Sequence, residues 1–220
     1  MKNIKVLHLA SNDKKGGASR AAYRVHKSLK KYAQQLNIDS KMRVITKLSN
    51  HSDIIGGPPF EKYIRYYFLR SLNKITRKLY ISDNPNYFSA PIYSTGMAKE
   101  LNNLYFDKKL NIVNLHWLGD NTISIKEIGD LKMPIAWRLA DEWAFCGCEQ
   151  YSEFVLDQDL SKYPFKYITG YKKWNLNKFI WEKKKKYFQK RINIIAPSKW
   201  IAKNASKSIL FKDSKIRVIP

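Results

Sequence analysis

The feature that most constrains the fold is a regular alternation of short apolar runs with segments of helical periodicity. Apolar runs of strand length occur at residues 4–10, 41–47, 112–116, 134–139, 192–196 and 216–219. Apolar residues recur at helical spacing over residues 18–36, 60–81, 97–104, 123–131, 176–189 and 198–208. This order predicts βαβ units in an α/β, Rossmann-like fold, with a mostly parallel sheet and helices on both faces.

The chain has the length and composition of one globular domain over residues 1–220, with 44% hydrophobic and 27% charged residues. The two cysteines, Cys146 and Cys148, are too few for a disulfide framework or a four-ligand zinc site, so no metal is expected. No apolar run approaches the roughly 18 residues that cross a bilayer. We therefore expect a cytoplasmic protein that can visit the inner face of the cell membrane without spanning it.

The net charge of +23, from 41 Lys and Arg against 18 Asp and Glu, is the most unusual property of the composition. A field of this sign favours an anionic partner, such as a phosphorylated substrate, an acidic membrane surface or nucleic acid. A salt-dependent shift with duplex DNA or RNA would support a nucleic-acid-binding function. The sequence contains no helix-turn-helix, zinc-finger or RNA-binding signature, which disfavours that alternative.

Two glycines follow the first predicted strand and open the first long helix. Ligands of doubly wound sheets bind at the carboxyl ends of the strands, where this segment lies. Glycines let the backbone approach a ligand closely, and the N–H groups and dipole of a helix N-terminus attract an anion. Gly16, Gly17 and Arg20 are therefore candidate substrate-binding residues. The alternative is a simple turn between a strand and a helix.

A histidine and a tryptophan, His116 and Trp117, end the strand predicted at residues 112–116. This position again lies at the ligand-binding edge of a parallel sheet. A flat aromatic face packs well against a sugar ring, so Trp117 is a candidate substrate-binding residue and His116 a candidate catalytic one. A core or surface histidine is the alternative.

Two adjacent acids, Asp141 and Glu142, follow the strand predicted at residues 134–139, just after Arg138. Carboxylates at a strand end can accept hydrogen bonds from sugar hydroxyls or help to remove a proton. Asp141 and Glu142 are candidate catalytic residues, and Arg138 is a candidate substrate-binding residue. The alternative is that Asp141 caps a helix and the neighbouring aromatic residues only fill the core.

The helix predicted at residues 60–81 is both basic and aromatic, which suits the surface of an anionic bilayer. The residues expected to face the membrane are Arg65, Arg70, Lys74 and Arg77. A second basic run, at residues 183–186, is expected to add positive charge. A solvated helix face is the alternative for both. Residues 50–59 and 146–175 are predicted loops, and long loops are often functional.

Taken in order, these segments resemble the N-terminal domain of family-four glycosyltransferases of the GT-B fold, the "group 1" bacterial enzymes that build capsules, exopolysaccharide and lipopolysaccharide. The matching segments are residues 16–26, 114–117, 137–151, 196–200 and 218–220. The resemblance runs from about Lys5 to Pro220. Each segment is short, but their order and spacing together are fairly specific.

The resemblance implies retaining transfer of a sugar from a nucleotide-sugar donor to a glycan or lipid-linked acceptor, with no cofactor. In such enzymes the N-terminal domain mostly holds the acceptor, and its glycine loop lies beside the donor phosphates. The C-terminal Rossmann domain, which binds the nucleotide sugar and supplies a pair of glutamates, is absent from these 220 residues. The alternative is therefore a non-catalytic, acceptor-binding fragment that needs a separate donor-binding domain.

The sequence departs from the family pattern at three places. Many relatives carry a histidine before the aspartate, where this chain has Ala140, so any role of that histidine is lost. A closer subgroup shares the segment that follows but has a histidine where this chain has Gln150. The cysteine-rich loop of some relatives is reduced to Cys146 and Cys148.

Overall fold

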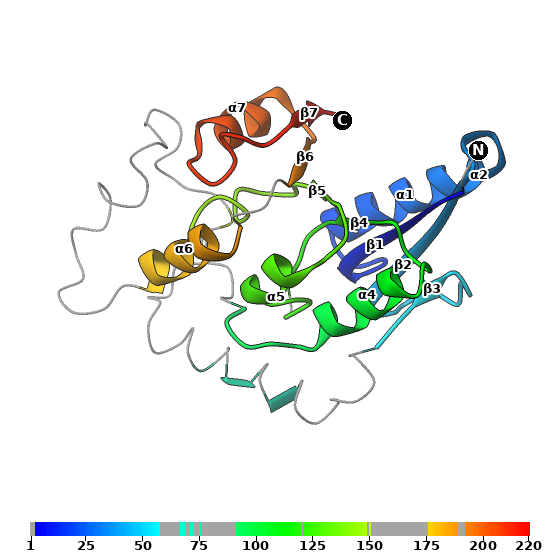
Figure 1. The fold of residues 1–220 in the computed structure, drawn as a ribbon, viewed down its shortest axis with the longest axis horizontal. Helices are drawn as coiled ribbons and strands as arrows, with labels where there is room; N and C mark the ends of the chain where they lie inside the picture. The colour runs from blue at the N-terminus through cyan, green and yellow to red at the C-terminus, as the bar shows by residue number, and fades with distance from the viewer. Residues whose placement is uncertain are drawn as a thin grey trace.

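The computed structural model describes residues 3–57, 67–68, 71–72, 75, 91–119, 121–148, 150, 176–188 and 192–220. They include one sheet of seven parallel strands in the order β3-β2-β1-β4-β5-β6-β7 (Figure 1). The strands are β1 (Ile4–Asn12), β2 (Ile38–Thr46), β3 (Ile54–Ile55), β4 (Ile112–Leu115), β5 (Ile135–Arg138), β6 (Asn193–Ala196) and β7 (Ile216–Val218). The predicted α/β, Rossmann-like fold is confirmed.

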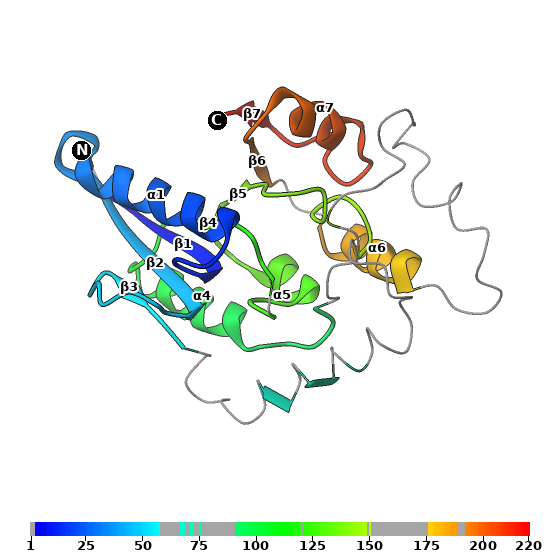
Figure 2. The same ribbon diagram turned by 180° about the vertical axis from the view of Figure 1, so that it is seen from behind.

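The described helices cover both faces of this sheet. They are α1 (Gly17–Lys31), α2 (Ala33–Leu36), α4 (Met97–Phe106), α5 (Ile125–Asp130), α6 (Leu176–Tyr187) and α7 (Lys199–Lys207). Two opposite views show α1 running along β1 and β2, with α4 and α5 across the sheet from it (Figures 1 and 2). The strand order reverses at β1, which pairs with β2 on one side and β4 on the other, and ligands of doubly wound sheets bind beside this reversal.

The residues of β1 divide the interior into two cores, because successive side chains of a strand point to opposite faces. Leu7 and Leu9 belong to the larger core, to which α4, α5, α6 and α7 also contribute. Ala10 belongs to a smaller core with Ala22 of α1 and with side chains of β2 and β3. His8 shares the strand face of Ala10, so this histidine occupies an interior position on the α1 side of the sheet.

Local sequence explains where two of the helices begin. The Ser124 hydroxyl accepts the N–H of Glu127 at 3.3 Å, and the Glu127 carboxylate accepts the Ser124 N–H at 3.0 Å, which forms a capping box for α5. The Ser198 hydroxyl accepts the N–H of Ile201 at 3.2 Å and caps α7. In contrast, α1 begins after Gly16 with no side-chain cap.

Two sequence predictions are wrong in detail. The segment at residues 50–59 is predicted as a loop, but it contains β3, which pairs with Met42 and Arg43 at the sheet edge. A strand of two residues is too short to produce a periodic pattern. The helix expected over residues 18–36 is interrupted at Tyr32, and the short α2 then ends at Asn37 in the left-handed conformation common at helix ends.

Two predicted segments lie largely outside the described residues. Within residues 60–81, only 67–68, 71–72 and 75 are described, all of them helical, and Arg65, Arg70, Lys74 and Arg77 are not among them. The predicted loop at residues 146–175 is described only at 146–148 and 150. In the part of the chain that the structure describes, no helix combines the length and apolarity needed to cross a bilayer.

Candidate functional site

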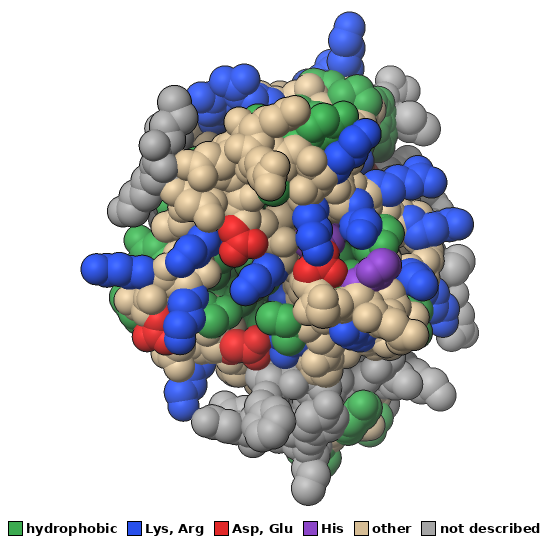
Figure 3. Space-filling view, turned by 90° about the vertical axis from the view of Figure 1, so that its right-hand side faces the viewer, with side chains coloured by type: hydrophobic (Ala, Val, Ile, Leu, Met, Phe, Trp, Pro, Cys, Tyr) green, Lys and Arg blue, Asp and Glu red, His purple; other side chains and the backbone are tan. Residues whose placement is uncertain are grey.

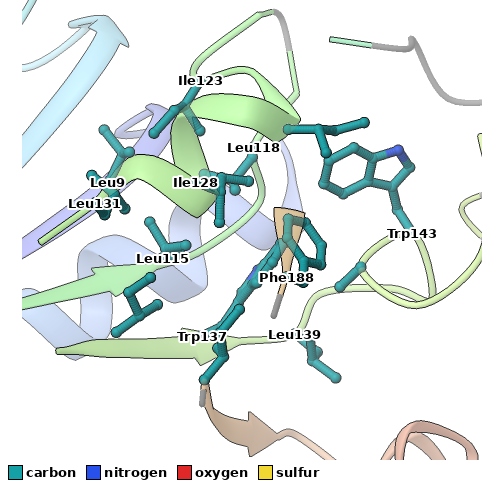
Figure 4. Packing of buried hydrophobic residues seen from close by; sticks show 14 of the residues in the cluster. Leu9, Leu115, Leu118, Ile123, Ile128, Leu131, Trp137, Leu139, Trp143 and Phe188 are labelled. Atoms are coloured by element: carbon teal, nitrogen blue, oxygen red, sulfur yellow. The ribbon is translucent and has the colours of Figure 1, made fainter. Parts of the chain in front are cut away.

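A small hollow lies where β4 and β5 end, at the edge of the sheet where α/β proteins bind ligands. Its lining includes three tryptophans and two titratable residues, namely Trp117, Trp137, Trp143, His116 and Asp141. The hollow contains about 250 Å³ of empty space, part of which is open solvent. Trp137 and Trp143 also belong to the packed core beneath it (Figure 4). Aromatic walls with a few polar groups are typical of small-molecule sites.

Asp141 is the carboxylate of this hollow, and it is 8% exposed. Burial raises its pKa to about 6, although the backbone N–H of Trp143, the charge of Lys184 and the Trp117 indole act in the opposite direction. The Trp143 N–H donates to Asp141 Oδ1 at 3.1 Å. The group is therefore mostly an anion at pH 7, and it becomes a hydrogen-bond donor near pH 6. It caps none of the described helices, so the helix-cap alternative is wrong.

Glu142 is fully buried but does not line the hollow. Its Oε1 accepts a hydrogen bond from the Asn204 side chain of α7 at 3.0 Å. Its backbone carbonyl accepts the N–H groups of Phe145 and Cys146. The structure therefore separates the two adjacent acids: Asp141 lines the hollow, and Glu142 links the turn after β5 to α7.

His116 lines the hollow and is paired with a second buried histidine, His8 of β1. His8 Nδ1 and His116 Nε2 lie 3.0 Å apart, and the side-chain nitrogen of Asn114 is 3.3 Å from the same Nδ1. Burial, aided by the charge of His26, lowers the pKa of His8 to about 3. Burial, followed by the charges of His8 and Arg138, holds the pKa of His116 well below 6.5. Both rings are therefore neutral at pH 7.

This histidine group is incompletely hydrogen-bonded. Among the described residues, His8 Nε2, His116 Nδ1 and Asn114 Oδ1 are buried and have no partner. Buried polar atoms in native proteins are rarely left in this state, and those that are often serve a site or a bound molecule. We call His8, Asn114 and His116 the histidine centre.

A neighbouring group on α1 is fully hydrogen-bonded. The His26 ring lies 5.7 Å from that of His8, and its two nitrogens contact Ser40 Oγ at 2.8 Å and Asp53 Oδ2 at 3.0 Å. Lys30 Nζ donates to the same Asp53 oxygen at 2.7 Å. Burial lowers the pKa of His26. Burial would raise the pKa of Asp53, but hydrogen bonds from Lys30 and His26 outweigh it and lower this pKa to about 2.

Lys184 of α6 forms a second buried polar centre, beside the same hollow. It is 0% exposed, and its Nζ donates to three backbone carbonyls. The acceptors are the carbonyls of Trp143, of Cys146 at 2.9 Å and of Gly147 at 2.7 Å. It also lies 3.7 Å from the centroid of the Trp143 ring. We call Lys184 and these three carbonyls the lysine centre. The run at residues 183–186 is predicted to add positive charge, with a solvated helix face as the alternative, but Lys184 does not belong to a solvated face: it is buried, and its three donors have three acceptors inside.

The glycine loop forms an uncapped helix N-terminus. Gly16 precedes α1 with φ 82° and ψ 168°, and the first turn contains no acidic residue. A Cβ on Gly16 or Gly17 would meet nothing within 4 Å, so the loop is open to solvent. Arg20 is exposed, and its Nε donates to the Gly16 carbonyl at 3.3 Å. The first-turn N–H groups are therefore available to an anion.

The glycine loop is linked to the hollow through the end of β1. The Ser11 N–H donates to the Trp117 carbonyl at 3.3 Å, so the chain leaves β1 beside the hollow. Gly16, Gly17 and Arg20 are not part of the hollow's lining. The structure thus gathers His116, Trp117 and Asp141 in one place and puts the glycine loop outside it.

Arg138, at the end of β5, is half-buried and is also outside the lining. Burial lowers the pKa of its guanidinium. Its charge is near enough to His116 to lower the pKa of that ring. Arg138 therefore keeps a positive charge close to the hollow.

Two buried polar residues beside the hollow, His8 and Lys184, were not anticipated from the sequence. His8 interrupts an apolar run, since Leu7, Leu9 and Ala10 are all buried core residues. A polar residue inside such a run was a usable signal, because buried polar groups need partners. Lys184 gave no such signal, because three further lysines surround it in the sequence.

Comparison with protein-family models, curated proteins and solved structures finds no match to this chain. Within the described residues, no group of three or more histidines, cysteines or acids is placed to hold a metal ion. Cys146 and Cys148 are buried free thiols.

Proposed function

We propose that this chain is the acceptor-side domain of a retaining, GT-B type glycosyltransferase of cell-surface polysaccharide synthesis. The observation that carries the proposal is the convergence of His116, Trp117 and Asp141 in one hollow at the ligand-binding edge of the sheet. An indole face packs on a sugar ring, while a neutral imidazole and a carboxylate bind its hydroxyls. The resemblance of five ordered sequence segments to the N-terminal domains of such enzymes supports the same function.

The donor phosphates would bind at the N-terminus of α1. The first turn offers free N–H groups, and Gly16 and Gly17 leave room for close approach. Arg20 lies beside these groups, and the net charge of +23 favours an anionic ligand. Lys and Arg side chains are spread over the face in Figure 3, with few acids between them. These groups would stabilise the negative charge that develops on the leaving nucleotide.

The groups of the hollow would hold the acceptor rather than bind charge. The Asp141 carboxylate accepts hydrogen bonds at neutral pH, and His116 does not become a cation there. Arg138 places a positive charge nearby, which suits an anionic part of the donor or acceptor. No separate general base is assigned, because a retaining transfer of this kind does not require one.

The test is ligand binding followed by turnover. Calorimetry should detect UDP- or GDP-hexoses and neutral glycans binding to the chain, and Asp141→Asn and Trp117→Ala should weaken glycan binding at least tenfold. Asp213→Asn is a matched control because Asp213 is exposed and lies on the loop after α7. A radiolabelled transfer assay, with a donor-binding domain supplied, distinguishes the enzyme from an acceptor-binding fragment. Unchanged glycan binding in both variants would contradict the proposal.

The membrane is a second proposed partner, because a lipid-linked acceptor lies there. The sequence of residues 60–81 combines basic and aromatic side chains, which suits an anionic lipid surface. Glutamate substitutions at Arg65, Arg70, Lys74 and Arg77 should abolish binding to vesicles that contain anionic lipid. Equal binding by the wild type and this variant would refute the membrane contact.

A further inference from the structure

The histidine centre has an arrangement of protons that can be worked out from its contacts. His8 Nδ1 has two neighbours, His116 Nε2 at 3.0 Å and the Asn114 side-chain nitrogen at 3.3 Å. Each neutral imidazole carries one proton, on one of its two nitrogens. The choice between the tautomers decides whether His116 Nδ1 presents a lone pair or an N–H to a ligand.

In the first arrangement, His116 Nε2–H donates to the lone pair of His8 Nδ1 at 3.0 Å, and an Asn114 N–H shares the same lone pair at 3.3 Å. The unpaired buried atoms are then one donor, His8 Nε2–H, and two acceptors, Asn114 Oδ1 and His116 Nδ1. This arrangement leaves two N–H groups without an acceptor among the described residues, His8 Nε2–H and the second N–H of Asn114, whereas the other arrangement leaves three.

In the second arrangement, His8 Nδ1–H donates to His116 Nε2, and the Asn114 amide must turn to present its oxygen. The Asn114 NH₂ group and His116 Nδ1–H are then buried donors that the described residues do not satisfy. Buried N–H groups without an acceptor are rarer than acceptors without a donor. The first arrangement is therefore favoured, and the amide orientation follows from the same count.

We propose that His8 is a positioning residue that holds His116 in the Nε2–H tautomer, so that His116 Nδ1 accepts a hydrogen bond from a hydroxyl of a neutral sugar. His116 lines the hollow while its Nε2 is engaged with His8, so Nδ1 is the ring nitrogen left for a ligand, and a small shift of the ring or its neighbours is needed to expose it. Nδ1 is buried and has no partner among the described residues. The identity of the ligand rests on the proposed function, whereas the tautomer does not.

The surroundings narrow the chemistry of the ligand. The hollow has room for about one water-sized group, so it would admit a single hydroxyl while the sugar ring stays outside, against the half-buried Trp117. Asp141, which lines the same hollow, supplies a second acceptor. Two acceptors would also suit an ammonium group, but the nearby charge of Arg138 disfavours a cation. A hydroxyl is the donor that these surroundings favour.

The tautomer is measured on the unsubstituted protein, and one variant serves only to assign the signals. Two-bond ¹H–¹⁵N correlation of histidine-labelled protein at pH 7 should show His116 protonated at Nε2 and unprotonated at Nδ1. The His116 signals are assigned by their loss in His116→Leu. A protonated Nδ1, in a neutral or a cationic ring, would overturn the proposal.

The positioning role is tested with two substitutions of His8. His8→Asn keeps an acceptor oxygen near the position of Nδ1 and should retain the His116 tautomer and sugar binding. His8→Phe removes the acceptor and should mix the tautomers and weaken binding of neutral hexoses and UDP- or GDP-hexoses about tenfold, the equivalent of about 1.4 kcal/mol. His51→Asn is the control, because His51 is exposed and contacts Tyr23. Circular dichroism checks that each variant is folded.

The outcomes separate this inference from the proposed function. Wild-type binding by His8→Phe, with the tautomer intact, would overturn the positioning role. The predicted tautomer in a protein that binds none of the sugars or nucleotide sugars would support the proton arrangement, and it would overturn both the ligand and the proposed function. Loss of binding in His8→Phe with rescue in His8→Asn would support the complete inference.

Discussion

The lysine centre and the histidine centre are both buried and polar, and both contribute to the same hollow, but they differ in how their hydrogen bonds are completed. The three donors of Lys184 meet three carbonyls. The histidine centre leaves His8 Nε2, His116 Nδ1 and Asn114 Oδ1 without partners among the described residues. Satisfied polar groups stabilise a structure, whereas unsatisfied ones lower its stability and are retained where function needs them.

The hollow has two walls, one formed by Trp143 beside the lysine centre and one formed by His116 of the histidine centre. The difference in hydrogen bonding suggests that the first wall is structural and the second binds the ligand. Lys184 ties α6 to the turn that carries Trp143, and Gly147 in that turn has no room for a side chain because Asn177 Oδ1 would lie 1.9 Å from its Cβ. This wall is rigid. The wall built by His116 keeps an open acceptor. Substitutions in the two centres should therefore separate stability from binding.

The largest expected effect comes from Lys184→Met. The methionine fills similar space but removes the ammonium that donates to the carbonyls of Trp143, Cys146 and Gly147, and the loss of a donor to a buried carbonyl costs about 1–3 kcal/mol. We expect a loss of about 3 kcal/mol or more in the free energy of unfolding, measured by urea denaturation. Lys185→Met is the matched control because Lys185 is exposed, and it should change stability by less than about 0.5 kcal/mol. Equal effects would show that the lysine centre is not structural.

The second effect is a dependence of stability on pH. The pKa of His8 is about 3 in the folded protein against an ordinary 6.5, so the unfolded chain takes up its proton first as the pH falls. The free energy of unfolding therefore falls as the pH drops from about 6.5 towards 3. In the lower part of this interval, His8 accounts for a loss of about 1.4 kcal/mol per pH unit. The lowered pKa values of His116 and His26 act in the same direction. His8→Phe should reduce the slope of unfolding free energy against pH, whereas His51→Asn should not.

Asp141 changes the stability with pH in the opposite sense to the buried histidines, over an overlapping pH range. Burial raises its pKa from 3.8 to about 6, so the folded state takes up this proton first and gains stability as the pH falls through that interval. Asp141→Asn should therefore make the acid loss of stability steeper. A shallower slope would mean that Asp141 is not protonated near pH 6 in the folded protein.

His116→Leu should have a smaller effect on the free energy of unfolding than Lys184→Met. It removes a buried polar ring with an unpaired nitrogen, and His8 Nδ1 keeps its contact with Asn114. The loss of one hydrogen bond is offset by added apolar burial, so the free energy of unfolding should change by less than about 1 kcal/mol. Sugar binding, measured by calorimetry, should fall at least tenfold. A stability loss as large as that of Lys184→Met would show that the histidine centre, like the lysine centre, mainly stabilises the fold.

The sequence predicted those parts of the site that depend on strand ends. His116 and Asp141 follow neighbouring parallel strands, and such ends meet at one edge of a sheet, so their convergence could be anticipated. Glu142 could not be separated from Asp141, because its buried position depends on Asn204, far away in the chain. The burial of Lys184 depends on the turn that carries Trp143, which periodicity does not reveal. Long-range contacts decided both cases.

The smallest expected change in stability comes from Gly119→Ala. An added Cβ would lie 2.1 Å from the Trp117 ring, so the indole must move. Trp117 is half-buried, so part of its side chain already faces solvent, and Gly119 is not in the left-handed region, so the backbone there accepts alanine. The free energy of unfolding should change by about 0.5 kcal/mol, because the weaker packing of the displaced indole is offset by the lower entropy of the unfolded alanine chain.

Gly119→Ala should alter the side of the hollow formed by His116 and Trp117 and leave the lysine centre unchanged. The displaced indole no longer donates to Asp141, so the pKa of Asp141 should rise further and sugar binding should weaken. The ¹H–¹⁵N signals of the tryptophan indoles measure this: the Trp117 signal should shift, and that of Trp143, held by Lys184, should not. Ser206→Ala on the exposed face of α7 is the control. If the Trp143 signal shifts as much as that of Trp117, the two walls are coupled, and the contrast between a rigid and an open wall is wrong.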